Sequence, residues 1–364
     1  MKTTIKTGVV FLAAFILAAF LLSCDGGEEA SGPIGPPNPN DPYPFWVANL
    51  QNDFAKYDRS GNRIASLVVD DAEGENSCFC FLNPCNGDLW FRTGVLHGTD
   101  YVRIYDRTGK YKKSLTDFDA SEYSALDTNR RWVWFGDYDD VNGNYYLNRS
   151  SLAGGAATRF NIPAQHPWTT YPSLRIGVYD RTGDVWVLGF FNDDGELIKL
   201  NKDGGLLYRD TLSAKGIRGP YILENIFVDQ TDGGVWITCV RMGGGYIQKI
   251  NRDGTNGIRI NTPGHIYDVS RSSGRVLINN YANRGLELYD KNGTMLWSKA
   301  DYKQVFAGGI VDATGEVIAA YQKDHCLRIA KFDSTGKPVF EDIGVFAGGG
   351  SETAVFVHNA PYPY

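Results

Sequence analysis

The sequence predicts an all-β protein: a β-propeller of seven four-stranded blades, closed into a ring by its C-terminal strand. Two recurring turn elements and the composition lead to this prediction. The first element is an apolar or aromatic residue, then Asp or Asn, two polar residues and Gly. The second is an apolar residue and Asp, a turn, and a strand that often opens with Trp. The 42 Gly, 21 Tyr and 8 Trp of the 364 residues suit a β protein dense in turns.

The first element recurs through the chain, with its Asp or Asn about 46 residues apart on average. A repeat of this length, rich in Gly and aromatic residues, is typical of a propeller blade. One copy, at Asn148, is degenerate, so a ring of six blades is the alternative. The Asp or Asn positions are Asp58, Asp106, Asn148, Asn201, Asn251, Asp290 and Asp333.

The second element precedes the later copies of the first, for example at 179–186, 228–236 and 311–317. Each unit therefore consists of strand A, a tight turn, strand B, a variable loop, strand C, a tight turn and strand D. Trp186 and Trp236 open B strands, and we expect them to pack between blades.

The two ends of the chain predict how the ring closes. Residues 45–49 resemble strand B of the later units, so the first unit lacks its strand A. Residues 353–358 form a spare strand at the other end. This strand can fill the gap and leave no open join in the ring.

The sequence Tyr-Asp-Arg-Thr-Gly occurs at 105–109 and again at 179–183. Asp can bond the backbone two residues further on, and Gly supplies a positive φ, as a tight turn requires. We expect a C–D turn at 105–109 and an A–B turn at 179–183, so the sequence marks turns and is not a binding motif. Because loops alternate between the two faces of a meander, the variable B–C and D–A loops share one face, the expected binding face.

The V-D-x-x-G-x-V-W element and the turn element that follows it resemble the NHL-repeat and six-bladed TolB-like propellers. The resemblance covers nearly the whole chain after residue 44. It lacks the regular N-H-R-I run of NHL repeats; residues 283–286 come nearest. Related propellers include lyases and lactonases, which place metal, His and acidic groups at the mouth of the central channel.

The N-terminus predicts an exported, lipid-anchored protein. Lys2 and Lys6 precede an apolar run of about 14 residues, which is short for a membrane-spanning helix. The run ends in Leu-Leu-Ser-Cys24, which resembles the lipobox of bacterial lipoproteins and implies palmitate and further acyl chains on Cys24. A short membrane anchor with a chance cysteine is the alternative.

These features divide the chain into three parts: a signal peptide over 1–23, a lipidated Cys and tether over 24–43, and a propeller over 44–364. The tether is rich in Gly, Pro and acidic residues and cannot bury enough apolar surface to fold. The resemblance implies a location in the bacterial cell envelope, periplasmic or surface-facing, on either membrane.

The charge argues against nucleic acid as a partner. There are 36 basic and 42 acidic residues, a net charge of −6, and no basic run. We expect a monomer.

The six cysteines include a cluster at Cys78, Cys80 and Cys85. A disulfide within this cluster, free thiols and a metal site are the three alternatives; the spacing lacks the paired elements of a usual zinc site. Cys239 lies in an apolar run and is expected to be buried, while Cys326 stands alone.

Histidine, acidic, arginine and aromatic residues gather in the variable loops. Histidine is a common base and metal ligand, although an idle surface role is the alternative for each one. Asp137 and Asp139, with the nearby Asp140, Asn142 and Asn144, suggest calcium; a solvated acidic loop is the alternative. The candidate binding face consists of His97, Asp137, Asp139, His166, Trp168, Asp193, Arg241, His265, Arg284 and His325.

Two functions are compatible with these features. The first is a tethered module that binds an envelope protein, a peptide or a glycan through its loop face. The second is a lyase- or lactonase-type enzyme with a metal-assisted site, for which calcium or another divalent ion would be the cofactor. The sequence contains no G-x-S-x-G, H-E-x-x-H or C-x-x-C-H motif.

Overall fold

The computed structural model describes residues 44–48, 53–68, 76–83, 87–94, 101–115, 124–139, 142–153, 156–166, 168, 174–191, 194–217, 226–241, 244–282, 285–302, 304–324, 326–346 and 354–357. The predicted signal peptide and tether lie outside this part of the chain. Within it, no helix is long and apolar enough to span a bilayer.

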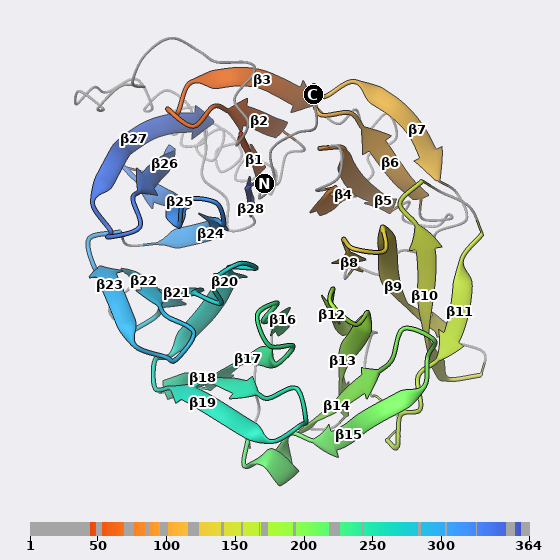
Figure 1. Ribbon diagram of the computed structural model, residues 1–364. Coiled ribbons are helices and arrows are strands. Elements are labelled where there is room, and N and C mark those ends of the chain that lie inside the picture. Colours follow the sequence, from red (N-terminus) through yellow and green to blue (C-terminus); the bar gives the residue numbers. More distant parts are fainter. Residues whose placement is uncertain are drawn as a thin grey trace, which may run out of the picture.

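Seven four-stranded antiparallel sheets form a ring around a central axis (Figure 1), which confirms the predicted seven-bladed propeller. The alternative of six blades is wrong, because the degenerate unit around Asn148 forms a complete blade. From the axis outward, the strands of blades 1 to 4 are β28 (Ala354–Val357), β1 (Phe45–Ala48), β2 (Asp53–Tyr57) and β3 (Arg63–Val68); β4 (Asn76–Leu82), β5 (Leu89–Gly94), β6 (Tyr101–Tyr105) and β7 (Tyr111–Leu115); β8 (Ser124–Asp127), β9 (Trp132–Asp139), β10 (Asn144–Ser151) and β11 (Thr158–Asn161); and β12 (Arg175–Tyr179), β13 (Asp184–Phe191), β14 (Asp194–Leu200) and β15 (Leu206–Thr211).

Blades 5 to 7 follow the same order, and a single short 3-10 helix, η1 (Ser213–Lys215), follows β15 in the described chain. Their strands are β16 (Ile226–Val228), β17 (Val235–Arg241), β18 (Gly244–Ile250) and β19 (Asn256–Ile260); β20 (Gly264–Val269), β21 (Val276–Asn280), β22 (Gly285–Tyr289) and β23 (Met295–Lys299); and β24 (Val305–Val311), β25 (Glu316–Lys323), β26 (Cys326–Phe332) and β27 (Pro338–Phe346).

The ring closes as predicted. The C-terminal strand β28 pairs antiparallel with β1, with Val357 opposite Phe45 and Ala354 opposite Ala48. Blade 1 therefore takes its innermost strand from one end of the chain and its other three from the opposite end. The closure hydrogen-bonds the edge of β1 that would otherwise face the axis.

The hydrophobic core is divided into seven clusters, one between each pair of adjacent blades. In each of the first five blades, a fully buried Trp on strand B packs toward the next blade. Trp186, for example, donates from its indole nitrogen to the carbonyl of Gly233, in the next blade, at 3.1 Å. These residues are Trp46, Trp90, Trp134, Trp186 and Trp236, which confirms the packing role expected for the last two.

The two copies of Tyr-Asp-Arg-Thr-Gly lie in turns, as predicted. At 105–109 the Asp106 carboxylate accepts the backbone N–H of Thr108 at 2.8 Å and of Lys110 at 3.0 Å. Gly109 has a φ of 89° and Gly183 has a φ of 76°. The first copy connects β6 to β7, and the second connects β12 to β13.

The glycine of most C–D turns is also the place where the preceding blade makes contact. A Cβ atom added to Gly254 would lie 2.1 Å from the Tyr208 ring of blade 4, and one added to Gly204 would lie 2.5 Å from Phe160 of blade 3. A side chain at this position would therefore be strained by its φ and would also displace a neighbouring blade. The same approach joins Ile258 to Gly293, Trp297 to Gly336 and Ile343 to Gly61, whereas Leu67 lies in ordinary contact with the corresponding position of Gly109.

A Lys or Arg on strand C, buried in three blades and half-buried in blade 3, adds a polar link at four of these junctions. In blade 7, Lys331 is 1% exposed, and its Nζ donates to the Arg59 carbonyl in the turn of blade 1 at 2.8 Å. Its charge is balanced by Glu316 at 3.2 Å. The other links run from Lys56 to the Arg107 carbonyl, from Arg149 to the Lys202 carbonyl and from Lys199 to the Arg252 carbonyl.

We expect Gly254→Ala to destabilise the propeller by about 2–4 kcal/mol, because it combines backbone strain with overpacking against Tyr208. Gly216→Ala is the matched control: its φ is 76°, but nothing lies within 4 Å of the added Cβ. It should cost only about 1 kcal/mol. Urea unfolding of both variants measures the difference; equal losses would show that the contact between blades contributes nothing.

Candidate functional site

The ring has two faces of different character. The A–B and C–D turns form one face, here called the turn face, and the B–C and D–A loops form the opposite loop face. Of the candidate binding residues, His97, Asp193, Arg284 and His325 lie outside the described residues. Only the backbone of Asp139 and Arg241 is described. Asp137, His166, Trp168 and His265 are described with their side chains, on three separate parts of the ring.

Trp168 is a buried anchor of the β11–β12 connection and not an exposed contact residue. Its ring is 7% exposed and packs closely over Gly189 of β13. The indole nitrogen donates to the Glu196 carboxylate at 3.0 Å, and the Tyr145 hydroxyl donates to the Trp168 carbonyl at 2.6 Å. The sequence places this aromatic ring on the candidate binding face, but its surroundings are those of the core.

Asp137 is held in an ion pair within blade 3. Its carboxylate accepts Nη2 of Arg159 at 2.7 Å and Nδ2 of Asn148 at 3.1 Å. The Arg159 guanidinium in turn lies 3.8 Å from the centre of the Tyr146 ring. The described side chains include no group of three His, Cys, Asp or Glu residues that could hold a metal. Calcium binding at this loop stays a prediction, since Asp140 and the Asp139 side chain are not described.

Two histidines of the loop face each pack against an aromatic ring. His166 stacks on Phe191 with ring centres 4.1 Å apart, and His265 lies edge-on to Tyr281 at 4.4 Å. Each pair joins residues near the end of strand B to residues at or before strand A of the same blade, blade 4 or blade 6. The pairs leave partly exposed aromatic and imidazole surface on this face.

The loop-face half of blade 7 concentrates backbone strain that the sequence did not predict. Three of the four described non-glycine residues with positive φ lie in or beside this blade: Gln304 at 61°, Asp324 at 51° and Asp342 at 61°. Strand β27 also shifts register at three places along β26. Strained positions and bulges of this kind are over-represented at functional sites.

A cluster of carboxylates and hydroxyls occupies the same part of blade 7. Asp342 accepts Nζ of Lys323 at 2.6 Å and the Tyr321 hydroxyl, and Glu341 accepts the Tyr302 hydroxyl. Burial would raise the pKa of Asp342, but the hydrogen bonds from Lys323 and Tyr321 outweigh it and lower the pKa. Asp342 therefore stays ionised, whereas burial and the nearby Asp342 charge raise the pKa of Glu341.

A cysteine outside the cluster takes part in a disulfide. Cys326, which is isolated in the sequence, is disulfide-bonded at the start of β26. Cys239 is free and fully buried, as expected, and its burial raises the pKa of the thiol to about 12. Only the backbone of Cys78 and Cys80 is described, in β4, and Cys85 lies outside the described residues, so a bridge within that cluster stays a prediction.

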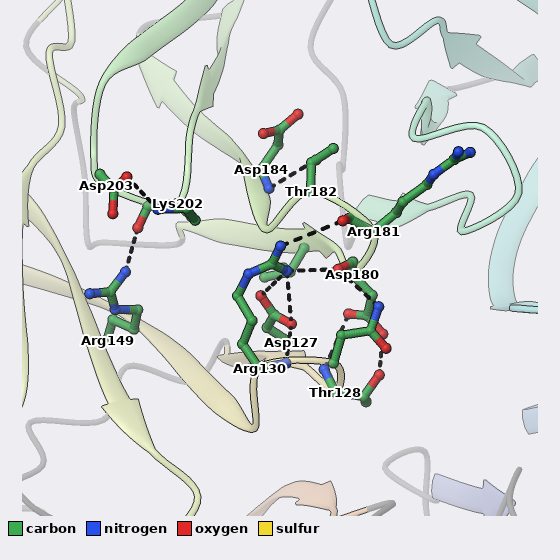
Figure 2. A network of polar contacts seen from close by, with 12 residues as sticks. Asp127, Thr128, Arg130, Arg149, Asp180, Arg181, Thr182, Asp184, Lys202 and Asp203 are labelled. Carbon is green, nitrogen blue, oxygen red and sulfur yellow. Dashed lines mark hydrogen bonds and ion pairs between the residues drawn. The ribbon is translucent and has the colours of Figure 1, made fainter.

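At the turn face, polar side chains meet around the ring axis (Figure 2). Arg130 donates to the Asp127 carboxylate at 3.1 Å and to the Asp180 carbonyl at 2.7 Å, which links blades 3 and 4. The Asp180 carboxylate accepts the Thr128 hydroxyl and also Arg271 of blade 6. The Asp106 carboxylate accepts hydrogen bonds within its own turn, whereas the Asp180 carboxylate accepts them from two other blades near the axis.

Asp268, on β20, is a deeply placed carboxyl group beside this network. It accepts the backbone N–H of Ile310 in blade 7 at 2.7 Å and keeps only partial access to solvent at the axis. Burial, together with the charge of Asp312, raises its pKa from 3.8 to about 7, while Arg271 opposes the shift. A register shift between Ile266 and Asp268 sets the position of this carboxyl group.

No family model and no curated protein matches the chain. Solved structures match its fold at very low sequence identity, which shows the propeller alone. A quinonprotein alcohol dehydrogenase-like protein from Bacteroides thetaiotaomicron is 12% identical, with a TM-score of 0.56 over 88% of this chain and 79% of that chain. Putative 6-phosphogluconolactonases from Bacteroides uniformis and Bacteroides fragilis are 13% and 12% identical, each with a TM-score of 0.57, over 86% and 88% of this chain and 100% and 99% of theirs.

The raised pKa of Asp268 predicts a pH-dependent stability. Between about pH 4 and pH 7 the folded protein holds a proton on this carboxyl group that the unfolded chain has lost, so the free energy of unfolding falls as pH rises through this window. Asp268→Asn should remove this slope and stabilise the protein at pH 8 by about 2 kcal/mol. Thermal unfolding at pH 5 and pH 8 measures the effect, with the exposed Asp301→Asn as control. An Asp268→Asn variant that is equally destabilised at both pH values would contradict the prediction.

Proposed function

We propose that this protein is a lipid-tethered binding module of the bacterial cell envelope, and that its loop face captures an envelope protein, a peptide or a glycan. The observation that carries the proposal is the difference between the two faces. The turns of one face are occupied by contacts that hold the ring together, whereas the loops of the other vary in length and composition. Variable loops on a rigid scaffold are where binding usually resides.

The side chains described on the loop face suit a binding surface. The two histidine–aromatic pairs and the strained end of blade 7 bring aromatic, imidazole, hydroxyl and carboxylate groups to the same face of the ring. Aromatic side chains supply contact area at low entropic cost, and polar groups around them supply specificity.

The entry point of the chain supports an outward orientation of the loop face. Phe45, the first residue of β1, pairs with Tyr57, which immediately precedes the turn from β2 to β3. The segment before residue 44 therefore joins the propeller at the turn face. A tether anchored through Cys24 would attach the turn face to the membrane and leave the loop face directed away from it.

The second candidate, a lyase- or lactonase-type enzyme, draws on the names of two of the structural matches. At 12–13% identity these matches carry no activity over to this chain. The described His and carboxylate groups of the loop face do not form a three-residue metal-ligating set. Binding is therefore the function we favour.

The test compares two double variants of the full mature chain that alter opposite faces of the ring near blade 6. Asn261→Arg with Ala282→Arg places two bulky charges on exposed loop-face positions, and Asn292→Arg with Thr294→Arg does the same in the exposed β22–β23 turn. Each protein is used to capture ligands from an envelope extract and from an array of bacterial glycans.

We expect the loop-face variant to lose at least about tenfold in affinity for the captured ligand, since two bulky charges disrupt a packed contact, and the turn-face variant to bind as the unaltered chain does. Loss in the turn-face variant alone would contradict the assignment of the binding face. Capture of nothing by any of the three proteins would remove the support for a binding module and turn attention to lactone hydrolysis.

A further inference from the structure

The exposed large apolar side chains of the described chain all lie on the outer rim of the turn face, at three separate blades. They occupy the first residues of the outermost strands of blades 2, 4 and 6. Each strand opens opposite the last residue of strand C: Tyr111 opposite Tyr105, Leu206 opposite Leu200, and Met295 opposite Tyr289. The five residues are Tyr111, Leu206, Leu207, Met295 and Leu296, each 42–52% exposed.

The same register position is polar or proline in three other blades, where Arg63, Asn256 and Pro338 occupy it. The apolar residues thus alternate around the ring, and Figure 1 shows β7, β15 and β23 widely separated on its periphery. Three separated points define a plane parallel to the turn face. A flat, extended partner can touch all three at once, whereas a small ligand or a peptide would touch only one.

The rim carries basic side chains among these apolar residues. Over the same seven positions, the six described C–D turns (57–63, 105–111, 200–206, 250–256, 289–295 and 332–338) contain eight Lys or Arg and six Asp, in a chain whose net charge is −6. Arg59 and Arg252 are paired with Glu316 and Asp184. Near Tyr111 the exposed Lys110, Lys112 and Lys113 follow Arg107 closely, and Lys112 is paired with Asp88. Apolar side chains mixed with lysine and arginine are the combination that binds an anionic lipid surface.

We infer that the rim of the turn face rests on the lipid surface to which the tether attaches, with the side chains of blades 2, 4 and 6 in contact with the headgroup region. The inference rests on the proposed lipid anchor at Cys24. The proposed tether joins the propeller at the turn face and contains about 20 residues; a flexible coil of this length would span roughly 25 Å. Such a tether would hold this face within reach of the bilayer.

Two methionines of this chain can serve as a matched pair of probes for contact with lipid. The chain has 3 Met: Met1, in the predicted signal peptide; Met295, on the rim; and Met242, which lies in the sequence between the end of β17 at Arg241 and the start of β18 at Gly244, the loop-face ends of these two strands. Hydroxyl-radical oxidation of the full lipidated chain, followed by mass spectrometry, reports the exposure of Met242 and Met295 in the same molecule. The chain is compared in detergent and on vesicles of phosphatidylethanolamine and phosphatidylglycerol.

On vesicles we expect oxidation of Met295 to fall at least about threefold and that of Met242 to stay unchanged. Leu206→Glu with Leu207→Glu, a change at exposed positions of β15, should weaken this protection. Co-flotation with the vesicles without protection of Met295, or with protection of Met242 instead, would overturn the lipid contact and leave the anchor intact.

Two further outcomes would overturn the inference for other reasons. If the unaltered chain failed to float with the vesicles, the lipid anchor itself would be wrong, and the contact with it. If Met295 were protected in detergent to a degree that rises with protein concentration, the rim would be an interface between two copies of this chain and not a lipid-contacting surface.

Discussion

The structure depends on the contact that a blade makes with the C–D turn of the next, seen at six of the seven junctions in the described part of the chain. At that turn a glycine with positive φ leaves room for an apolar side chain from the preceding blade, as Tyr208 lies against Gly254. At four junctions a Lys or Arg of strand C also donates to the carbonyl of the second residue of the turn. A sheet of four short strands has two apolar faces and cannot be stable alone, so these junctions must repeat all round the ring.

This constraint explains why the two faces of the propeller differ. A turn that must accept an apolar side chain and a cation from the neighbouring blade can vary little, so the same five-residue pattern returns in blade after blade. The loop-face residues that the structure describes show no such repeated contact, and the loops differ in length and chemistry. The turn face therefore forms a rigid scaffold, and the loops of the loop face can vary in sequence without disturbing it.

Around the axis, charged side chains link blades directly to one another. Four carboxyl groups from blades 3, 4, 6 and 7, those of Asp127, Asp180, Asp268 and Asp312, gather there with the guanidinium groups of Arg130 and Arg271. Arg271 reaches from blade 6 to blade 4, and Asp268 accepts a backbone N–H from blade 7. The network therefore ties together blades that are far apart in the sequence, in addition to the closure by β28.

The sequence by itself determined the class of fold, the number of blades, the closing strand and the role of the Tyr-Asp-Arg-Thr-Gly turns, because all of these follow from local periodicity and turn chemistry. The lysine two residues before the turn Asp or Asn, at Lys56, Lys199 and Lys331, is a readable signal of three of these junctions that the predictions from sequence did not include. Only the tertiary structure decided that Trp168 is buried, that Asp137 is paired with Arg159, and that Asp180 acts across the axis while Asp106 caps its own turn. Such differences depend on which blades the closed ring brings together, and identical residues in two turns carry no information about that.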